Sequence, residues 1–424
     1  MPSSTANNDK KRINNIKSAD TMESRLFPAI RYFALMLLCS LTIAGHAQWD
    51  DDDDVTQEEL MMSEIPVDER IFHQRWTDVP FNKDFFTYSD EQMKQRWGEF
   101  MRGLRAPFPD ADFLRYAIER YPALVEDVDA FTGDYEDFSR KNLEVWRLFL
   151  RGDFQEAREE GLKLGPFGLY PAMFSQIMYA IYLAERQSDK YMLLQDVANQ
   201  VQQYMHILDE AADDPDQRMQ EMVAFTKLGH AYAIARIAEE SPVPVIITRG
   251  YIGDIKDGAE EVLSHVPDHP LGHAFIAGVD AGIMRRVGRA TGRITYGARS
   301  TTVDESFTAA FEMAPDIPIL NYEYANAILY TSRRRDLNEV FEYLERATRF
   351  QPSFSMDALD AMYGFKRLQE VRMFDDHYRS FRQFERQRRG FARVTDHNLT
   401  NVMSPVLTLD MLENPENYAL PERD

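Results

Sequence analysis

The chain has 424 residues, a formal net charge of −22, a hydrophobic share of 44% and a charged share of 28%. That apolar share is large enough to form a packed core, which excludes a wholly disordered chain. The negative charge argues against a general nucleic-acid-binding protein, because the phosphate backbone repels an acidic surface. The length suits two or three domains, or one array of repeats.

The first 47 residues have the layout of a secretory signal peptide. The apolar run Phe33–Ala44 follows basic residues and precedes Gly45-His46-Ala47, and it is shorter than the ~20 residues that span a bilayer. We therefore predict a signal peptide over 1–47 with cleavage near Ala47. Whether translation starts at Met1 or at Met22 is left open. The mature protein is expected to be periplasmic or secreted, with no stable membrane anchor.

The segment after the predicted cleavage point is strongly acidic. Cys39 is the only cysteine and lies inside the signal peptide, so the mature chain has no disulfide. Leu38 before it argues against a lipid anchor, because a lipoprotein signal has a small residue there. The run Asp50–Asp54 lacks the alternating ligands and the glycine of a calcium loop. We interpret 48–88 as a solvated acidic leader and an extended segment.

Helical patterns dominate the rest of the chain. Ser89-Asp90-Glu91-Gln92 is a capping box that predicts a helix, Asp110 is the expected cap of a second, and 138–150 places apolar residues on one helical face. The region 89–137 is therefore predicted to be helical. The main strand candidate is 241–248, whose prolines restrict it to an extended loop or an edge. With almost no strands to pack on, helices must pack on helices.

Two kinds of sequence mark recur in the middle of the chain. A large residue, a Leu-Gly pair and an aromatic residue one turn later are typical of the first helix of a helical-hairpin repeat, and they occur at Phe225, Leu228, Gly229 and Tyr232. An alanine followed by a terminating proline marks the second helix, as in Ala310 with Pro315 and Ala347 with Pro352. These two prolines are 37 residues apart, close to the ~34 of a tetratricopeptide unit.

The chain therefore resembles tetratricopeptide-repeat (TPR) proteins. The motifs at 292–300, 307–316, 322–327 and 356–360 are together similar to a group of exported bacterial repeat proteins of undefined activity. The resemblance implies an all-α fold, an α-solenoid of degenerate TPR-like helical hairpins over 138–370. Two insertions, at about 239–253 and 286–300, interrupt the repeats. A C-terminal amphipathic helix at 371–394 and a polar tail at 395–424 complete the predicted organisation.

No catalytic motif is present in the sequence. It contains no nucleophile elbow, phosphate-binding loop, dinucleotide fingerprint or zinc helix. His265, His269 and His273 have the helical spacing of metal ligands, but Pro267 and Pro270 lie between them and prevent one continuous helix. We expect Pro267 to end one helix and His269-Pro270 to begin the next. We therefore predict no catalytic residue, no metal site and no cofactor.

Arginines cluster in two places near the second half of the chain. The first cluster has no acidic residue within it and consists of Arg285, Arg286, Arg289, Arg293 and Arg299. The geometry of a guanidinium group suits an anion-binding site. We favour the alternative that these arginines form ion pairs with the acidic N-terminal half of the chain and that the pairs hold the curvature of the solenoid. The second cluster accompanies an aromatic stripe at Phe374, Tyr378, Phe381 and Phe384. We favour a terminal capping helix there over a lipid-binding helix.

The leading functional hypothesis is an exported scaffold that binds a protein or peptide partner in the cell envelope, and not a nucleic acid. Stacked hairpins leave a concave groove. The residues expected to line this groove or its rim are Tyr232, His273, Arg289, Arg293, Tyr322, Tyr324 and Asn326. Tyrosine and arginine most often dominate such contacts. The identity of the partner and the oligomeric state are left open.

Two alternatives come from other functional classes. One is a small-ligand-binding subunit, because exported repeat proteins associated with tripartite ATP-independent periplasmic transporters are broadly similar. An apolar cavity with one or two arginines would favour it, and an open groove would favour the scaffold. The other is a glycan-active enzyme on an α/α toroid, which requires two facing carboxylates about 5–10 Å apart.

Overall fold

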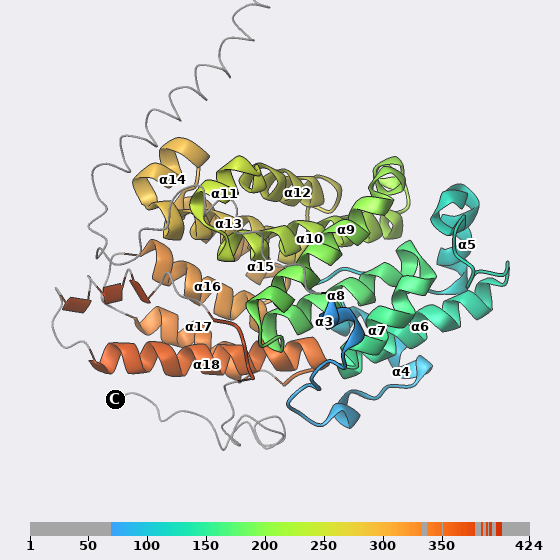
Figure 1. Cartoon of the computed structure of the whole chain (residues 1–424), viewed down its shortest axis with the longest axis horizontal. Helices are drawn as coiled ribbons and strands as arrows, with labels where there is room; N and C mark the ends of the chain where they lie inside the picture. The colour runs from blue at the N-terminus through green and yellow to red at the C-terminus, as the bar shows by residue number, and fades with distance from the viewer. Residues whose placement is uncertain are drawn as a thin grey trace, which may run out of the picture. The chain divides into compact units, whose positions relative to one another are not determined.

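The computed structural model describes residues 69–332, 337–349, 351–377, 383–384, 387–388, 390–391 and 396–400. Over these residues the fold is all-α, with no β-strand (Figure 1), as predicted. They all belong to the compact unit that spans residues 61–424. The predicted signal peptide at 1–47, the acidic run that follows it and the tail beyond residue 400 lie outside the described residues.

The described elements are, in chain order, α3 (Arg70–His73), η1 (Lys83–Phe86), α4 (Asp90–Phe100), α5 (Ala111–Arg120), η2 (Pro122–Val125), α6 (Tyr135–Arg151), α7 (Phe154–Gly161), η3 (Leu162–Leu164), α8 (Pro166–Tyr182), α9 (Gln187–Ala211), α10 (Gln217–Glu240), α11 (Val243–Thr248), α12 (Tyr251–His265), α13 (Pro270–Val287), α14 (Arg289–Tyr296), α15 (Ser300–Met313), α16 (Pro318–Thr331), α17 (Asn338–Thr348) and α18 (Ser355–His377). The elements labelled η are short 3₁₀ helices.

The predicted helix starts in the N-terminal region are confirmed. Ser89 forms a capping box with Gln92 at the start of α4, and the side chain of Asp110 accepts a hydrogen bond from the amide of Phe113 at the start of α5. Such caps satisfy amide groups that have no partner inside the helix and contribute ~1 kcal/mol each. Trp97, on the predicted apolar face of α4, packs edge-to-face against Trp146 of α6.

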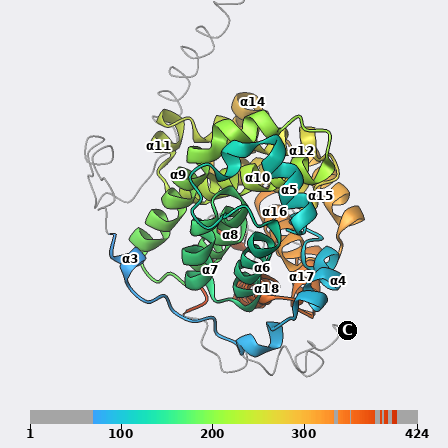
Figure 2. The ribbon, with the colours of Figure 1, turned by 90° about the vertical axis from the view of Figure 1, so that its right-hand side faces the viewer.

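Neighbouring helices pack in pairs along the chain. The pairs are α6 with α7, α8 with α9, α10 with α12, α13 with α15, and α16 with α17. The first members of successive pairs also contact one another, as α6 does with α8 and α13 does with α16, and α16 contacts the final helix α18. In Figure 2, α6, α8, α10 and α16 lie in the middle of the helices and α9, α12, α15 and α17 lie around them.

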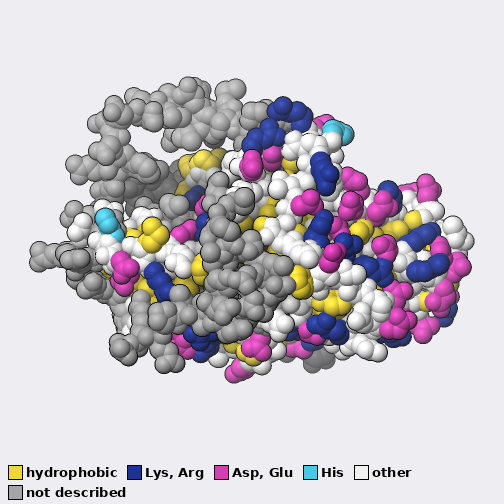
Figure 3. All heavy atoms as spheres, turned by 90° about the horizontal axis from the view of Figure 1, so that it is seen from below, with side chains coloured by type: hydrophobic (Ala, Val, Ile, Leu, Met, Phe, Trp, Pro, Cys, Tyr) yellow, Lys and Arg dark blue, Asp and Glu magenta, His cyan; other side chains and the backbone are white. Residues whose placement is uncertain are grey.

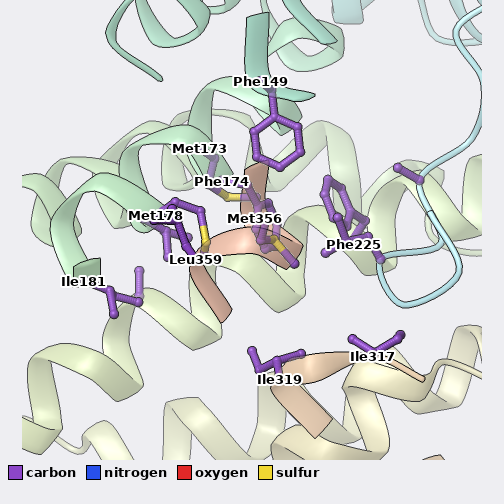
Figure 4. Packing of buried hydrophobic residues seen from close by; sticks show 14 of the residues in the cluster. Phe149, Met173, Phe174, Met178, Ile181, Phe225, Ile317, Ile319, Met356 and Leu359 are labelled. Carbon is purple, nitrogen blue, oxygen red and sulfur yellow. The ribbon is translucent and has the colours of Figure 1, made fainter. Parts of the chain in front are cut away.

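Side chains fill the space between α6, α8, α16 and α18. Ser355 of α18 donates a hydrogen bond to the carbonyl of Phe149 of α6 across 2.7 Å. The hydroxyl groups of Tyr182 on α8 and Tyr322 on α16 are 2.8 Å apart. Figure 4 shows Met356 of α18 packed among the side chains of α8. Helix α18 therefore lies against α6, and the sides of α6, α8, α16 and α18 that face one another form a packed core.

The turn between α6 and α7 depends on a glycine. Gly152 has a φ of 91°, the left-handed conformation that glycine adopts without strain, and its amide donates to the carbonyl of Leu148. A Cβ at Gly152 would lie 3.0 Å from Val79 and 3.2 Å from Ser355. The small residue Ala157, in the helix that follows the turn, is fully buried.

The prediction of an extended loop or edge at 241–248 is wrong. This segment forms α11, with Pro242 as its N-cap residue and Pro244 in its first turn. Amide groups in the first turn have no partner inside a helix, so prolines there cost no hydrogen bond. Pro-containing runs are therefore compatible with a short helix. The predicted insertions at 239–253 and 286–300 contain α11 and α14, respectively.

The C-terminal part packs onto the helices by its aromatic stripe. Helix α18 is continuous across the boundary that the sequence placed at 370/371. Phe374 contacts Phe384 with ring centroids 5.3 Å apart, and Phe384 is fully buried. Tyr378 and Phe381 lie outside the described residues. The amide of Leu399 donates to the carbonyl of Tyr182 across 2.8 Å, which fixes residues 396–400 against the end of α8. Among the described residues, no helix is long and apolar enough to span a membrane.

Candidate ligand-binding site

A cavity of about 180 Å³ lies between α10, α11, α12, α13 and α16. Its wall is mainly aliphatic and aromatic. Apolar side chains that line it include Leu228 and Ala235 of α10, Ile246 and Ile247 of α11, Ile252 and Ile255 of α12, Phe275 and Val279 of α13, and Leu320 and Ala327 of α16. Helices on several sides of the hollow therefore present apolar surface to it.

Two glycines of α13 leave room for this cavity. Gly278 and Gly282 both line it, and a Cβ at either position would meet no atom within 4 Å. Glycine inside a helix costs ~1 kcal/mol relative to alanine, and no positive φ requires it at these positions. These two glycines, four residues apart on one helical face, are a local signal of the hollow that the sequence-based predictions did not include.

The polar end of the cavity is built around Arg236 of α10. Its guanidinium donates to Glu239 across 2.8 Å and to Glu323 of α16 across 2.7 Å. It also donates to the hydroxyl of Tyr232 across 2.7 Å and lies over the Tyr232 ring, 4.8 Å from its centroid. All four side chains line the cavity.

Two further arginines, from the end of α13, lie at this end. Arg285 contacts Glu239 and the hydroxyl of Tyr330, each across 3.4 Å. Arg286 donates a hydrogen bond to the carbonyl of Ser241 just before α11. Three guanidinium groups and two carboxylates therefore line the cavity.

The electrostatics keep Glu239 ionised. Burial raises the pKa of this carboxyl, but the positive charges of Arg236 and Arg285 outweigh burial and hold its pKa at about 2. Burial raises the pKa of the Tyr232 and Tyr330 hydroxyl groups, so both remain neutral at neutral pH and accept hydrogen bonds from Arg236 and Arg285. The cavity end thus presents charged side chains and neutral hydroxyl groups to a ligand.

A second polar cluster lies behind the cavity wall, in the packed core. Tyr182 and Tyr322 both donate to the carboxyl of Asp360 on α18. Burial raises the pKa of Asp360 to about 8. His397 stacks on Tyr363 at 4.2 Å, and burial, followed by the charge of Arg236, lowers the pKa of His397 well below its usual range.

The predicted groove residues on α10 and α16 do not share one surface. Tyr232 lines the cavity. Tyr322 and Asn326 are fully buried in the core, where Asn326 accepts a hydrogen bond from Arg367 across 2.9 Å. Tyr324 points to the other side of α16 and packs against Phe307 of α15, with ring centroids 4.9 Å apart. Alternate faces of one helix thus separate residues that are close in sequence.

The other three predicted groove residues are on or near α13 and α14. His273 contacts the carbonyl of Pro267 across 2.8 Å. Arg289 donates to the carbonyl of Thr331 at the end of α16 across 2.6 Å. Arg293 is exposed on α14. Of the seven residues, Tyr232 alone lines the cavity.

The interpretation of the histidines is confirmed for the start of α13. His269 is its N-cap and accepts a hydrogen bond from Gly272, and Pro270 occupies the first position. Burial lowers the pKa of His269 to about 3, so its neutral ring acts as the acceptor. The described residues contain no group of three or more His, Cys, Asp or Glu side chains that could hold a metal ion.

The prediction that the first arginine cluster pairs with the acidic N-terminal half is confirmed for one of its arginines. Arg285 pairs with Glu239, which lies in the acidic part of the chain, whereas Arg286 donates to the backbone carbonyl of Ser241. Arg293 and Arg299 are exposed instead.

In comparisons with known proteins, no family model, no curated protein and no solved structure matches the chain.

Proposed function

We propose that this protein binds a small, mainly apolar ligand that carries an anionic head group. The observation that carries this proposal is the cavity itself, which has an apolar wall and three arginines at one end. The scaffold hypothesis instead requires an open inner surface lined by Tyr322 and Asn326. Both side chains are fully buried, so the small-ligand alternative has the better support.

The dimensions of the cavity suit an apolar group. Apolar cavities of ~150 Å³ in protein cores remain dry and bind molecules of the size of benzene. The present cavity is larger, at about 180 Å³. When an aromatic ring or a short alkyl chain moves from water into the apolar part of the cavity, it displaces no hydrogen-bonded group. This transfer contributes ~25 cal/mol of binding free energy per Å² of apolar surface removed from water.

The charges at the polar end favour an anion. Arg236, Arg285 and Arg286 line the cavity together with Glu239 and Glu323, so guanidinium groups outnumber carboxylates in the lining. A guanidinium binds a carboxylate by paired, charge-assisted hydrogen bonds, which are stronger than neutral ones. A cationic head group gains nothing comparable there. The preferred ligand is therefore a carboxylate with an apolar body.

The arrangement supports binding more than catalysis. A glycan-active enzyme needs one carboxyl with a raised pKa as a proton donor. Both carboxyls at the cavity, Glu239 and Glu323, are paired with Arg236, and the pKa of Glu239 is lowered to about 2. Asp360 has a raised pKa but belongs to the core cluster behind the wall.

We further propose that the helix pairs form a TPR-like α-solenoid in an exported protein. The sequential pairing of α6 with α7 through α16 with α17 supports the repeat architecture. The signal-peptide pattern supports export. In this setting the protein is a ligand-binding subunit associated with a periplasmic transporter, which is what the resemblance to transporter-associated repeat proteins implies.

Calorimetric titration with three probes tests the proposed ligand class. Octanoate provides an alkyl chain and a carboxylate, octanol provides the chain alone, and butanoate provides the charge with a shorter chain. We expect octanoate to bind more tightly than either of the others. Equal binding of octanol and octanoate would contradict the role of the arginines, and absence of binding by all three would contradict the proposed function.

A further inference from the structure

Two exposed isoleucines lie at the side of the protein where α11 and α14 are found. Ile294 of α14 is 82% exposed and Ile247 of α11 is 40% exposed. In the described part of the chain, three other large apolar side chains are exposed, and all three belong to other elements. Exposure of an isoleucine side chain to water is unfavourable, and it is most pronounced at Ile294.

The same two segments carry positive charge in an acidic chain. No acidic residue occurs between 241 and 253 or between 281 and 303, although the net charge of the whole chain is −22. The side chains of Arg249, Arg293 and Arg299 are exposed. By contrast, on the face seen in Figure 3, acidic and basic side chains are intermixed. The segments of α11 and α14 therefore combine exposed apolar groups with exposed arginines and contain no acidic residue of their own.

Helices α11 and α14 also form part of the cavity wall. Val243, Ile246 and Ile247 of α11 and Tyr296 of α14 line the cavity. The amino group of Lys256 on α12 donates to the carbonyl of Tyr296 across 2.9 Å, which ties α14 to the helix that follows α11. Both ribbon views place α11 and α14 on the same side of the helices (Figure 1 and Figure 2).

We propose that α11 and α14 form a docking surface for an anionic lipid bilayer. We define this surface by Ile247, Ile294, Arg249, Arg293 and Arg299. Basic residues are attracted to anionic headgroups, and apolar side chains between them enter the headgroup boundary. The inference rests on the proposed function, because it gives the source of the ligand: an apolar carboxylate that partitions into the bilayer reaches the cavity through the helices that line it.

Charge and polarity together favour a bilayer over an acidic protein segment. An acidic segment such as Asp50–Asp54 complements Arg293 but offers nothing to Ile294. An anionic bilayer satisfies both. The two occupants differ in a measurable way, because a bilayer places residue 294 in an apolar environment and an acidic peptide leaves it in water.

A dye at position 294 tests this proposal in the full chain. The chain has one cysteine, so a Cys39→Ser background accepts an Ile294→Cys substitution labelled with an environment-sensitive fluorophore. With vesicles of phosphatidylcholine and phosphatidylglycerol we expect a blue shift, weaker at high salt. A Gly98→Cys label, on the exposed side of α4, is the control and stays unshifted. An unshifted emission at 294 overturns the proposal, even if the apolar run at 33–44 holds the chain on vesicles.

Charge variants measure the contribution of the arginines. Each arginine near an anionic surface contributes about fivefold to binding, so the triple variant Arg249→Gln/Arg293→Gln/Arg299→Gln should weaken the binding that produces the shift at 294 by about a hundredfold. The control exchanges three exposed arginines elsewhere, Arg75, Arg115 and Arg140. Equal losses in both variants overturn the assignment to α11 and α14.

The failure of docking is separable from the failure of the proposed function. Octanoate titration without vesicles reports the cavity alone, and the triple variant should retain the affinity of the unmodified protein. Conversely, Gly278→Leu/Gly282→Leu should lose octanoate and keep the vesicle-dependent shift. Vesicle binding that disappears together with the cavity would overturn docking through these surface residues.

Discussion

The buried Arg236 of α10 and the half-buried Glu323 of α16 form an ion pair with an N–O distance of 2.7 Å, although 87 residues separate them in the sequence. Arg236 also pairs with Glu239, and the three side chains line one end of the cavity. This relationship joins two helices of different hairpins and sets the charge that a ligand meets. It therefore links the stability of the fold to the chemistry of the site.

Replacement of Arg236 should be destabilising. Arg236→Met leaves Glu323 without its guanidinium partner and Glu239 with Arg285 as its remaining ion-pair partner described above. Removal of one partner of a fully buried pair typically costs about 3–5 kcal/mol, and the loss here should be smaller because the side chains of Glu239 and Glu323 are 32% and 23% exposed. Urea unfolding of Arg236→Met, compared with the unmodified protein, measures the loss.

A second substitution separates the charge effect from packing. In Arg236→Met/Glu323→Met the stranded carboxylate is gone, so part of the lost stability should return. A double variant that is less stable than Arg236→Met would contradict the assigned pairing. Octanoate affinity should decrease in both variants, since each lacks the central guanidinium.

The stability of the protein should depend on pH through Asp360. Burial raises the pKa of this carboxyl to about 8 in the folded state, against about 4 in the unfolded chain. Between these values the folded state holds a proton that the unfolded state has lost. The stabilising contribution is therefore complete below about pH 4 and is lost as the pH rises through 8.

Asp360→Asn isolates this contribution. The amide retains an acceptor for the hydroxyl of Tyr182 and cannot ionise. Unfolding free energies at pH 5, 6, 7 and 8 should show a difference that increasingly favours the variant as the pH rises. The difference is the relevant quantity, because His269 and His397, whose pKa values are lowered, act in the opposite sense as the pH falls. A difference that is constant with pH would exclude a raised pKa at Asp360.

The turn at Gly152 should be sensitive to a single methyl group. Gly152→Ala forces alanine into a φ of 91° and places its Cβ 3.0 Å from Val79, so we expect a loss above the ~1–2 kcal/mol of the backbone conformation alone. Gly133→Ala is the matched control, because Gly133 has a φ of 90° and no neighbour within 4 Å of an added Cβ. Thermal unfolding of both variants gives the difference, and equal losses would show that the contact with Val79 is not tight.

A substitution that fills the cavity should remove binding without unfolding the protein. Gly278→Leu/Gly282→Leu adds two apolar side chains where no atom lies within 4 Å of the new Cβ atoms, and it replaces two poor helix formers. We expect a melting temperature equal to or above that of the unmodified protein, and no further increase with octanoate. Gly98→Leu, in the exposed side of α4, serves as the control and should keep the octanoate-dependent increase. An increase that persists in the filled variant would place the ligand elsewhere.

The helical elements could be predicted where local chemistry decides them. The capping box at Ser89, the cap at Asp110 and the start of α13 at His269-Pro270 depend on neighbouring residues and were predicted correctly. The segment at 241–248 was not, because prolines near an N-terminus are compatible with both an extended chain and a first helical turn.

The site could not be predicted in the same way, because it depends on contacts between distant helices. Arg236, Glu239 and Glu323 look like ordinary surface charges in the sequence, and the packing of α10 against α13 and α16 brings them together at one end of a cavity. Tyr322 and Asn326 fit a groove by their repeat position, but the return of α18 to α6 buries that side of α16. Gly278 and Gly282 were the one local signal of the hollow.

A crystal structure with 8-bromooctanoate tests ligand binding in the cavity most directly, because the bromine can be located by its anomalous scattering. We predict one bromine peak between Gly278 of α13 and Ile246 of α11, with the carboxylate toward Arg236 and Arg285. A cavity without bromine in crystals saturated with the ligand, or a peak outside it, would contradict the account.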